Sequence, residues 1–164
     1  IVDQALEYLQ LDCIENKYLH QLSGGQRQRA YIAMVVAQDT KYVLLDEPLN
    51  NLDMRHSVEI MKTLQSLVED LKKTVVIVLH DINFASCYSD YIVAMDNDNI
   101  AGINRLKREN PRAQVAKLMD FVKEARESEV PDPYYTGNFD YVYSLVTEGC
   151  QALLEHIKAD KGIE

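Results

Sequence analysis

The sequence lacks several features that would each assign it to a broad class of protein. No apolar run reaches the roughly 18 residues that a membrane-spanning helix needs, and no basic segment followed by an apolar one marks a signal peptide. The three cysteines, Cys13, Cys87 and Cys150, lie far apart and form no C-x-x-C pair. This spacing argues against a disulfide framework and a zinc site, and we expect reduced thiols in the cytoplasm.

Positive charge is also scarce. The 164 residues carry 17 Lys and Arg against 26 Asp and Glu, which gives a net charge of −9. The acidic excess is spread along the chain, because residues 1–88 hold 8 basic and 12 acidic side chains and residues 89–164 hold 9 and 14. We therefore expect no nucleic acid among the partners and no broad surface for anionic lipid.

The sequence does contain an alternation of helical and strand-like segments. Apolar spacing predicts helices over 2–10, 24–37, 61–71, 82–88, 97–109 and 142–157. Unbroken apolar runs predict strands that are buried on both faces at 42–45, 74–79 and 91–95. Residues 114–119 fit either a strand or a helix, and 128–138, with two prolines and a glycine, are predicted as loop. The alternation predicts an α/β fold, a mostly parallel sheet with alternating helices in three layers.

Two segments place polar groups where phosphate chemistry would need them. Ser23-Gly24-Gly25 precedes a predicted helix, and backbone N–H groups at a helix start can approach an anion closely. An ordinary helix cap has the same pattern. Asp46 and Glu47 end a predicted strand, where one carboxylate can support magnesium and the next can orient a water. The alternative is a strand that simply ends in polar residues.

Two further segments are weak signals by themselves. Asn50-Asn51-Leu52-Asp53 is typical of a turn. His80 follows the next predicted strand, where a histidine is more often structural than catalytic. They become informative only through their order and spacing relative to the two segments above.

Together the four segments resemble the ATP-binding cassette (ABC) ATPase family. Leu22 to Gln26 is similar to its signature motif, 43–47 to its Walker B strand, 50–53 to its D-loop and His80 to its switch histidine. The run from Leu79 to Ala85 resembles the ATPase subunits of iron-chelate (siderophore) importers in particular. The resemblance covers residues 1 to about 95.

This resemblance implies cofactors, partners and residue roles. The cofactors would be ATP and Mg²⁺, with Asp46 supporting the metal, Glu47 polarising the attacking water and His80 contacting the γ-phosphate. The partners would be a second ABC ATPase subunit and a membrane permease, which would hold the cytoplasmic chain at the inner face of the membrane. Ser23, Gly24 and Gly25 would contact the γ-phosphate of ATP held by that second subunit, and Gln26 and Asp53 would be further nucleotide-binding residues.

The phosphate-binding loop of that family is missing from the sequence. No segment matches G-x-x-x-x-G-K-[ST], whose backbone N–H groups and lysine cradle the phosphates of ATP. Without this cradle, carboxylates at the strand end would repel the nucleotide. We expect no ATP hydrolysis by the chain alone.

A second resemblance begins at about residue 89. The run Asp132-Pro133-Tyr134-Tyr135 and the amphipathic helix after it resemble the low-molecular-weight protein-tyrosine-phosphatases. By this resemblance Asp132 is the general acid, Tyr134 and Tyr135 line the substrate cleft, and the partner is a phosphotyrosine protein. The alternative for Asp132-Pro133 is a simple turn start.

The nucleophile loop of the phosphatases, C-x5-R, is missing as well. The residues six places after Cys13, Cys87 and Cys150 are leucine, valine and histidine, so none of the cysteines has the required arginine. We therefore expect no turnover of phosphotyrosine by this chain.

The two resemblances overlap in a strand-like run at 89–96, which divides the chain into parts 1–95 and 89–164. The chain starts at Ile1 inside a helical pattern, and we expect each parent to lack its front half. Three hypotheses follow: an incomplete ABC ATPase subunit of an iron-chelate importer, a phosphatase-like protein without its nucleophile, and a non-catalytic chimera of two incomplete α/β domains.

Overall fold

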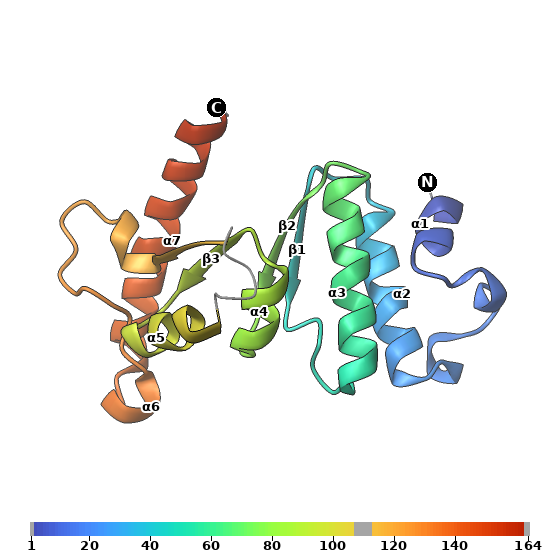
Figure 1. Cartoon of the computed structure of the whole chain (residues 1–164), viewed down its shortest axis with the longest axis horizontal. Coiled ribbons are helices and arrows are strands. Elements are labelled where there is room, and N and C mark those ends of the chain that lie inside the picture. Colours follow the sequence, from blue (N-terminus) through green and yellow to red (C-terminus); the bar gives the residue numbers. More distant parts are fainter. Residues whose placement is uncertain (1, 107–112, 163–164) are drawn as a thin grey trace. The chain divides into compact units, whose positions relative to one another are not determined.

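A computed structural model describes residues 2–106 and 113–162 of the chain. The chain divides into two compact units, Ile1–Asp81 and Ile82–Glu164. Each unit combines helices with a small parallel sheet, so the α/β class expected from the sequence is confirmed (Figure 1). The strands described form two two-stranded sheets, β1–β2 and β3–β4.

The first unit is mostly helical. Its elements are α1 (Val2–Tyr8), the 3₁₀ turns Asp12–Ile14 and Leu19–Gln21, α2 (Gly24–Val36), β1 (Tyr42–Asp46), α3 (Met54–Glu69) and β2 (Thr74–Val78). β1 and β2 pair in parallel from Tyr42 opposite Thr74 to Asp46 opposite Val78. Since α3 connects these two strands, the sheet's two carboxyl ends meet at one edge.

The expectation that these two strands are buried on both faces is wrong. Val43 is buried, but its neighbour Leu44 is 72% exposed, and Val76 and Val78 in β2 are also exposed. Side chains alternate between the two faces of a strand, and the helices of the unit cover one face only. An unbroken apolar run therefore gives one buried face and one open apolar face.

The second unit has the same number of described strands as the first and one more described α-helix. Its elements are α4 (Ile82–Tyr88), β3 (Tyr91–Ala94), α5 (Asn97–Leu106), β4 (Gln114–Lys117), the 3₁₀ turn Leu118–Phe121, α6 (Pro133–Thr136) and α7 (Phe139–Lys161). β3 and β4 pair in parallel from Tyr91 opposite Gln114 to Ala94 opposite Lys117. Asn138 caps the start of α7 by accepting from the Tyr141 N–H at 3.1 Å.

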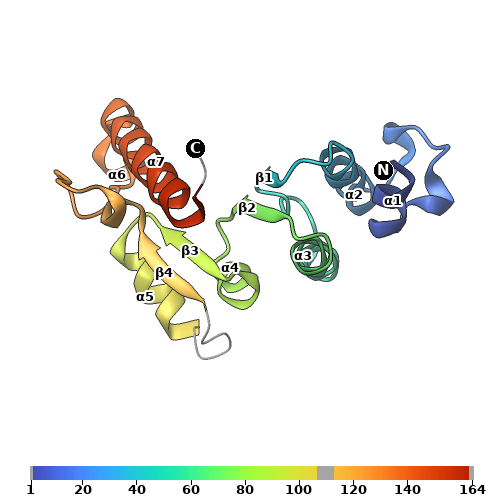
Figure 2. The ribbon, with the colours of Figure 1, turned by 90° about the horizontal axis from the view of Figure 1, so that it is seen from above.

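Both faces of the second sheet are covered. On one face Ile92 and Ala94 pack with Ile103 of α5, and α4 adds apolar side chains to the same cluster. On the other face Val93 joins a cluster that contains Leu145 of α7. Figure 2 shows the resulting layers, with α7 on one side of β3 and β4 and α5 on the other.

In the second unit one expectation is wrong, one open choice is decided and one lies partly outside the described residues. The predicted loop at 128–138 contains a short helix, α6, which ends at Thr136 and is followed by Gly137 in the left-handed conformation at φ 65°. The ambiguous segment 114–119 forms strand β4 and then a 3₁₀ turn. The helix expected over 97–109 is described as far as Leu106, and its last three residues lie outside the described residues.

Candidate functional site

The first turn of α2 is organised by Ser23. The Ser23 hydroxyl accepts a hydrogen bond from the Gln26 N–H at 3.3 Å, and the Ser23 N–H donates to the Gln26 side chain at 3.1 Å. This reciprocal capping box uses the Gln26 N–H and leaves those of Gly24 and Gly25 as donors without an intrahelical partner. Space beside Gly24 is open, since an added Cβ there would meet no atom within 4 Å.

Asp46 and Glu47 stand where the sequence placed them, at the end of β1. Asp46 is exposed, and Glu47 follows it with a positive φ of 44°, which turns its side chain out of the strand direction. The Glu47 N–H donates to the Val78 carbonyl at 3.0 Å, so the turn is fixed to the end of β2.

The structure brings Glu47 and His80 together. Glu47 Oε1 lies 3.6 Å from His80 Nδ1, and the Asn50 side chain donates to Glu47 Oε2 at 3.3 Å. The carboxylate is thus held between the two segments that follow β1 and β2. Among the described residues no hydrogen bond or ion pair joins Ser23 or Gln26 to this pair.

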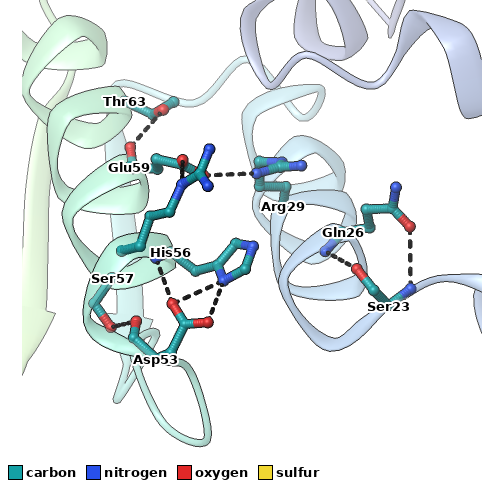
Figure 3. Close-up of polar contacts among 9 residues, drawn as sticks. Ser23, Gln26, Arg29, Asp53, His56, Ser57, Glu59 and Thr63 are labelled. Carbon is teal, nitrogen blue, oxygen red and sulfur yellow. Dashed lines mark hydrogen bonds and ion pairs between the residues drawn. The ribbon is translucent and has the colours of Figure 1, made fainter.

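Asp53 caps the start of α3. Its Oδ1 accepts from the His56 N–H at 2.9 Å, and both carboxylate oxygens lie 2.9 Å from His56 Nδ1 (Figure 3). These hydrogen bonds hold the pKa of the Asp53 carboxyl below its usual value of 3.8, and the bond from the His56 backbone N–H has the largest effect. Ser57 adds a bond from its hydroxyl to the Asp53 carbonyl at 3.0 Å.

Sequence reasoning missed the residues that join α2 to α3. A Cβ on Gly25 would lie 2.8 Å from His56 Cδ2, so the His56 ring packs against the start of α2. One turn further along, Arg29 Nη1 lies 3.4 Å from Glu59 Oε2, and Arg55 pairs with the same carboxylate at 3.2 Å. The three-residue spacing of Asp53 and His56 was a readable capping signal, but nothing in the sequence pairs His56 with Gly25.

The second unit holds the remaining predicted site residues. Asp132 caps α6, and its Oδ1 accepts from the Tyr134 N–H at 2.8 Å. Tyr134 and Tyr135 are each 84% exposed and stack edge to face with ring centroids 5.4 Å apart. In this arrangement the Asp132 carboxylate caps α6, and the rings of Tyr134 and Tyr135 project into solvent.

The described residues offer few other chemical groups. Cys13, Cys87 and Cys150 are exposed, and none of them forms a disulfide. No group of three or more His, Cys, Asp or Glu side chains within residues 2–106 and 113–162 is arranged to hold a metal ion. No helix within those ranges is long and apolar enough to cross a bilayer.

Comparison with known families gives two matches along the chain. The family model for ABC transporters matches residues 1–50, and that for low molecular weight phosphotyrosine protein phosphatase matches residues 50–162. The junction of these matches lies well before the run at 89–96, and the two compact units meet at residues 81 and 82.

Individual proteins that are similar to the chain include ATP-binding proteins of petrobactin import. The chain is 71% identical over 99 residues to the petrobactin import ATP-binding protein YclP of Bacillus subtilis, a match over 60% of this chain and 39% of YclP. It is 44% identical over 134 residues to the petrobactin import ATP-binding protein FatE of Bacillus anthracis, which covers 82% of this chain and 52% of FatE. The chain thus spans about two fifths and about half of these relatives. Because the YclP match is longer than 50 residues, it continues into the region of the phosphatase match.

Solved structures give the same picture for part of the chain. The structure of cbiO1 from Clostridium perfringens, part of the ABC transporter complex cbiONQ, aligns with a TM-score of 0.52 and 38% identity over 54% of this chain and 36% of that one. A putative metal-chelate type ABC transporter in an inward-facing conformation aligns with a TM-score of 0.53 and 35% identity over 54% of this chain and 36% of its own. By the extent of the family matches, the chain belongs to the low molecular weight phosphotyrosine protein phosphatase family over residues 50–162, and its amino-terminal part resembles the ABC transporter ATPases.

Proposed function

We propose that the chain is an incomplete ABC ATPase subunit of an iron-chelate importer that presents Ser23-Gly24-Gly25 to ATP held by a second, intact cassette. The observation that carries this proposal is the first turn of α2, where two glycine N–H groups are left over by the capping box and open space lies beside Gly24. The 71% identity to a petrobactin import protein supports the substrate class.

The end of the β1–β2 sheet supports the same proposal. If ATP were held at this edge, the Glu47 carboxylate, which lies beside Asn50 and His80, would accept a proton from a water and His80 would contact the γ-phosphate. Asp46 offers one exposed carboxylate, which suits a Mg²⁺ that arrives with ATP and keeps most of its ligands from phosphate and water. Bound there, Mg²⁺ would neutralise charge on the phosphates.

We propose further that this chain does not hydrolyse ATP by itself. Its sequence contains no P-loop, and its carboxylates at the end of β1 repel the phosphates that such a loop would hold. The test is Mg²⁺-dependent ATP hydrolysis by the purified chain and by its Glu47→Gln variant. We expect background rates from both, and activity that disappears in Glu47→Gln would contradict the proposal.

A phosphatase role is the second candidate, because the matching family model spans residues 50–162. Asp132 would protonate the leaving phenolate and the exposed Tyr134 and Tyr135 would contact a phosphotyrosine protein. The sequence offers no C-x5-R nucleophile, so we expect no hydrolysis of an aryl phosphate. Measurable turnover that falls in Asp132→Asn would favour this candidate over the first.

The third candidate is a non-catalytic chimera of two incomplete α/β domains, with parts 1–95 and 89–164. Two family matches along one chain and partial coverage of the relatives support it. This candidate is favoured if the chain hydrolyses neither ATP nor an aryl phosphate and does not change the ATPase rate of an intact cassette. If the first proposal holds, the partners are a second ATPase subunit and a permease, and the chain works in the cytoplasm at the inner face of the membrane.

A further inference from the structure

The imidazole of His56 fills the space beside Gly25. A Cβ built on Gly25 would lie 2.8 Å from His56 Cδ2, 3.2 Å from Cγ and 3.3 Å from Nε2, and Gly25 itself is buried. A Cβ atom does not normally approach another heavy atom this closely, so alanine at position 25 would force the His56 ring or the first turn of α2 to shift.

The other side of the same ring is fixed by Asp53. Its Nδ1 lies 2.9 Å from both carboxylate oxygens, while the His56 N–H donates to Oδ1, also at 2.9 Å. Because backbone and ring bind one carboxylate, the ring has little freedom to rotate. Figure 3 shows the ring directed from α3 toward the start of α2.

We propose that His56 is a positioning residue that clamps the turn ending in Asp53 to the first turn of α2. This inference rests on the proposed function, in which both turns face ATP held by a second cassette. The clamp makes the two turns one rigid body, so that the N–H groups of Gly24 and Gly25 keep a fixed direction relative to the Asp53 turn.

A second contact keeps the two helices in register. Arg29 and Glu59 pair one turn beyond Gly25 and His56, and Arg55 holds the same carboxylate from its other side. Two contacts one turn apart oppose the sliding of α2 along α3. The direction of the glycine N–H groups is therefore set by α3 and not by the cap of α2 alone.

The first test uses three variants: His56→Ala, Gly25→Ala and the double variant. In an ordinary helix, alanine in place of glycine is neutral or stabilising. We expect Gly25→Ala to lower the urea midpoint in the presence of His56 and to leave it unchanged or raise it in the His56→Ala background. Equal effects of Gly25→Ala in both backgrounds would overturn the clamp.

The second test asks whether the clamp serves binding. We would measure amide hydrogen exchange at residues 24–26 and the Kd of the chain for YclP, as the intact cassette, with ATP and Mg²⁺. For His56→Ala we expect faster exchange in this turn and a Kd raised at least about threefold. Because asparagine keeps a donor toward Asp53, His56→Asn should recover part of the loss in affinity. Met54→Ala, which changes an exposed residue of the same turn, is the matched control and should change neither quantity.

The outcomes separate the two proposals. If the wild-type chain does not bind YclP with ATP, the proposed function fails. The clamp is still tested by the amide exchange rates and by whether Gly25→Ala raises or lowers the urea midpoint. If the chain binds and His56→Ala binds equally well with unchanged exchange, the clamp is refuted and the proposed function stands.

Discussion

Glu47 and His80 face each other from the ends of adjacent parallel strands, with Glu47 Oε1 3.6 Å from His80 Nδ1. Both side chains remain open to solvent, at 42% and 70% exposed. An exposed pair of this kind adds little to stability, whatever the protonation state of the histidine. Replacing either side chain should therefore have little effect on folding.

The first prediction concerns this pair. We expect Glu47→Gln and His80→Ala to change the free energy of unfolding by less than about 1 kcal/mol, because the surrounding water screens the interaction. Urea unfolding followed by circular dichroism measures it. Val43→Ala, at a buried position of the same strand, is the control and should cost more than about 1 kcal/mol. A loss above about 2 kcal/mol in either site variant would indicate a structural pair instead.

The second prediction concerns pH and Tyr8. Its hydroxyl donates to the Asp70 carboxylate and to the Ser66 carbonyl, the latter at 3.2 Å. Burial and then the Asp70 hydrogen bond and charge raise the Tyr8 pKa from 10.0 to about 12. Since the folded pKa is above the unfolded one, the stabilisation is complete below pH 10 and is lost as the pH rises through about 12.

The measurement compares the wild-type chain with Tyr8→Phe, which cannot ionise at this position. The difference between their urea midpoints should stay constant below pH 10 and shrink or change sign between pH 10 and about 12. A difference that is independent of pH across this window would show that the Tyr8 hydroxyl makes no such bond in solution.

The third prediction concerns the open face of the first sheet. Leu44, Val76 and Val78 expose apolar side chains on neighbouring strands, and such faces promote association. We expect Leu44→Thr to reduce self-association in sedimentation velocity while it changes stability by no more than about 0.5 kcal/mol. Val43→Thr places the same side chain on the buried face and should destabilise without improving solubility. Unchanged association in Leu44→Thr would mean that this face is covered.

The fourth prediction concerns Gly149 in α7. A Cβ there would lie 2.5 Å from Leu118 Cγ, and Leu118 is almost completely buried, so it has no room to move. Helix propensity alone would make Gly149→Ala stabilising by about 1 kcal/mol, whereas overpacking should make it destabilising by about 1–3 kcal/mol.

Thermal unfolding shows whether Gly149→Ala raises or lowers the melting temperature. Ser144→Ala changes an exposed residue of the same helix and should leave the melting temperature nearly unchanged. Leu118→Ala in the Gly149→Ala background should remove the clash, so the two changes should be strongly non-additive. A more stable Gly149→Ala would refute the close packing of α7 on the turn at Leu118.

Local patterns in the sequence predicted most of the elements. The apolar runs located β1, β2 and β3, and Ser23-Gly24-Gly25 indicated the start of α2, because such signals depend on neighbouring residues. The sequence predicts loop for the Asp-Pro-Tyr-Tyr run, because its single helical turn is too short to show a helical period.

What the sequence could not predict depends on contacts between distant segments. Gly25 and His56 are separated by 31 positions, and their packing follows from how α2 lies on α3. Arg29 and Glu59 meet for the same reason. The exposure of Leu44 was missed because an apolar run shows which side chains avoid water and not how many faces the surrounding helices cover.

The most direct test of the account is whether the 164-residue chain joins an intact cassette in an ATP-dependent way. YclP with ATP and Mg²⁺ would be titrated with the wild-type chain and with Ser23→Ala, which removes the cap of α2, and complex formation and the ATPase rate would be measured together. We predict a complex that requires ATP, a changed rate, and weaker binding of Ser23→Ala. If neither dimerisation nor the ATPase rate of the intact cassette responds to the chain, the central claim is contradicted.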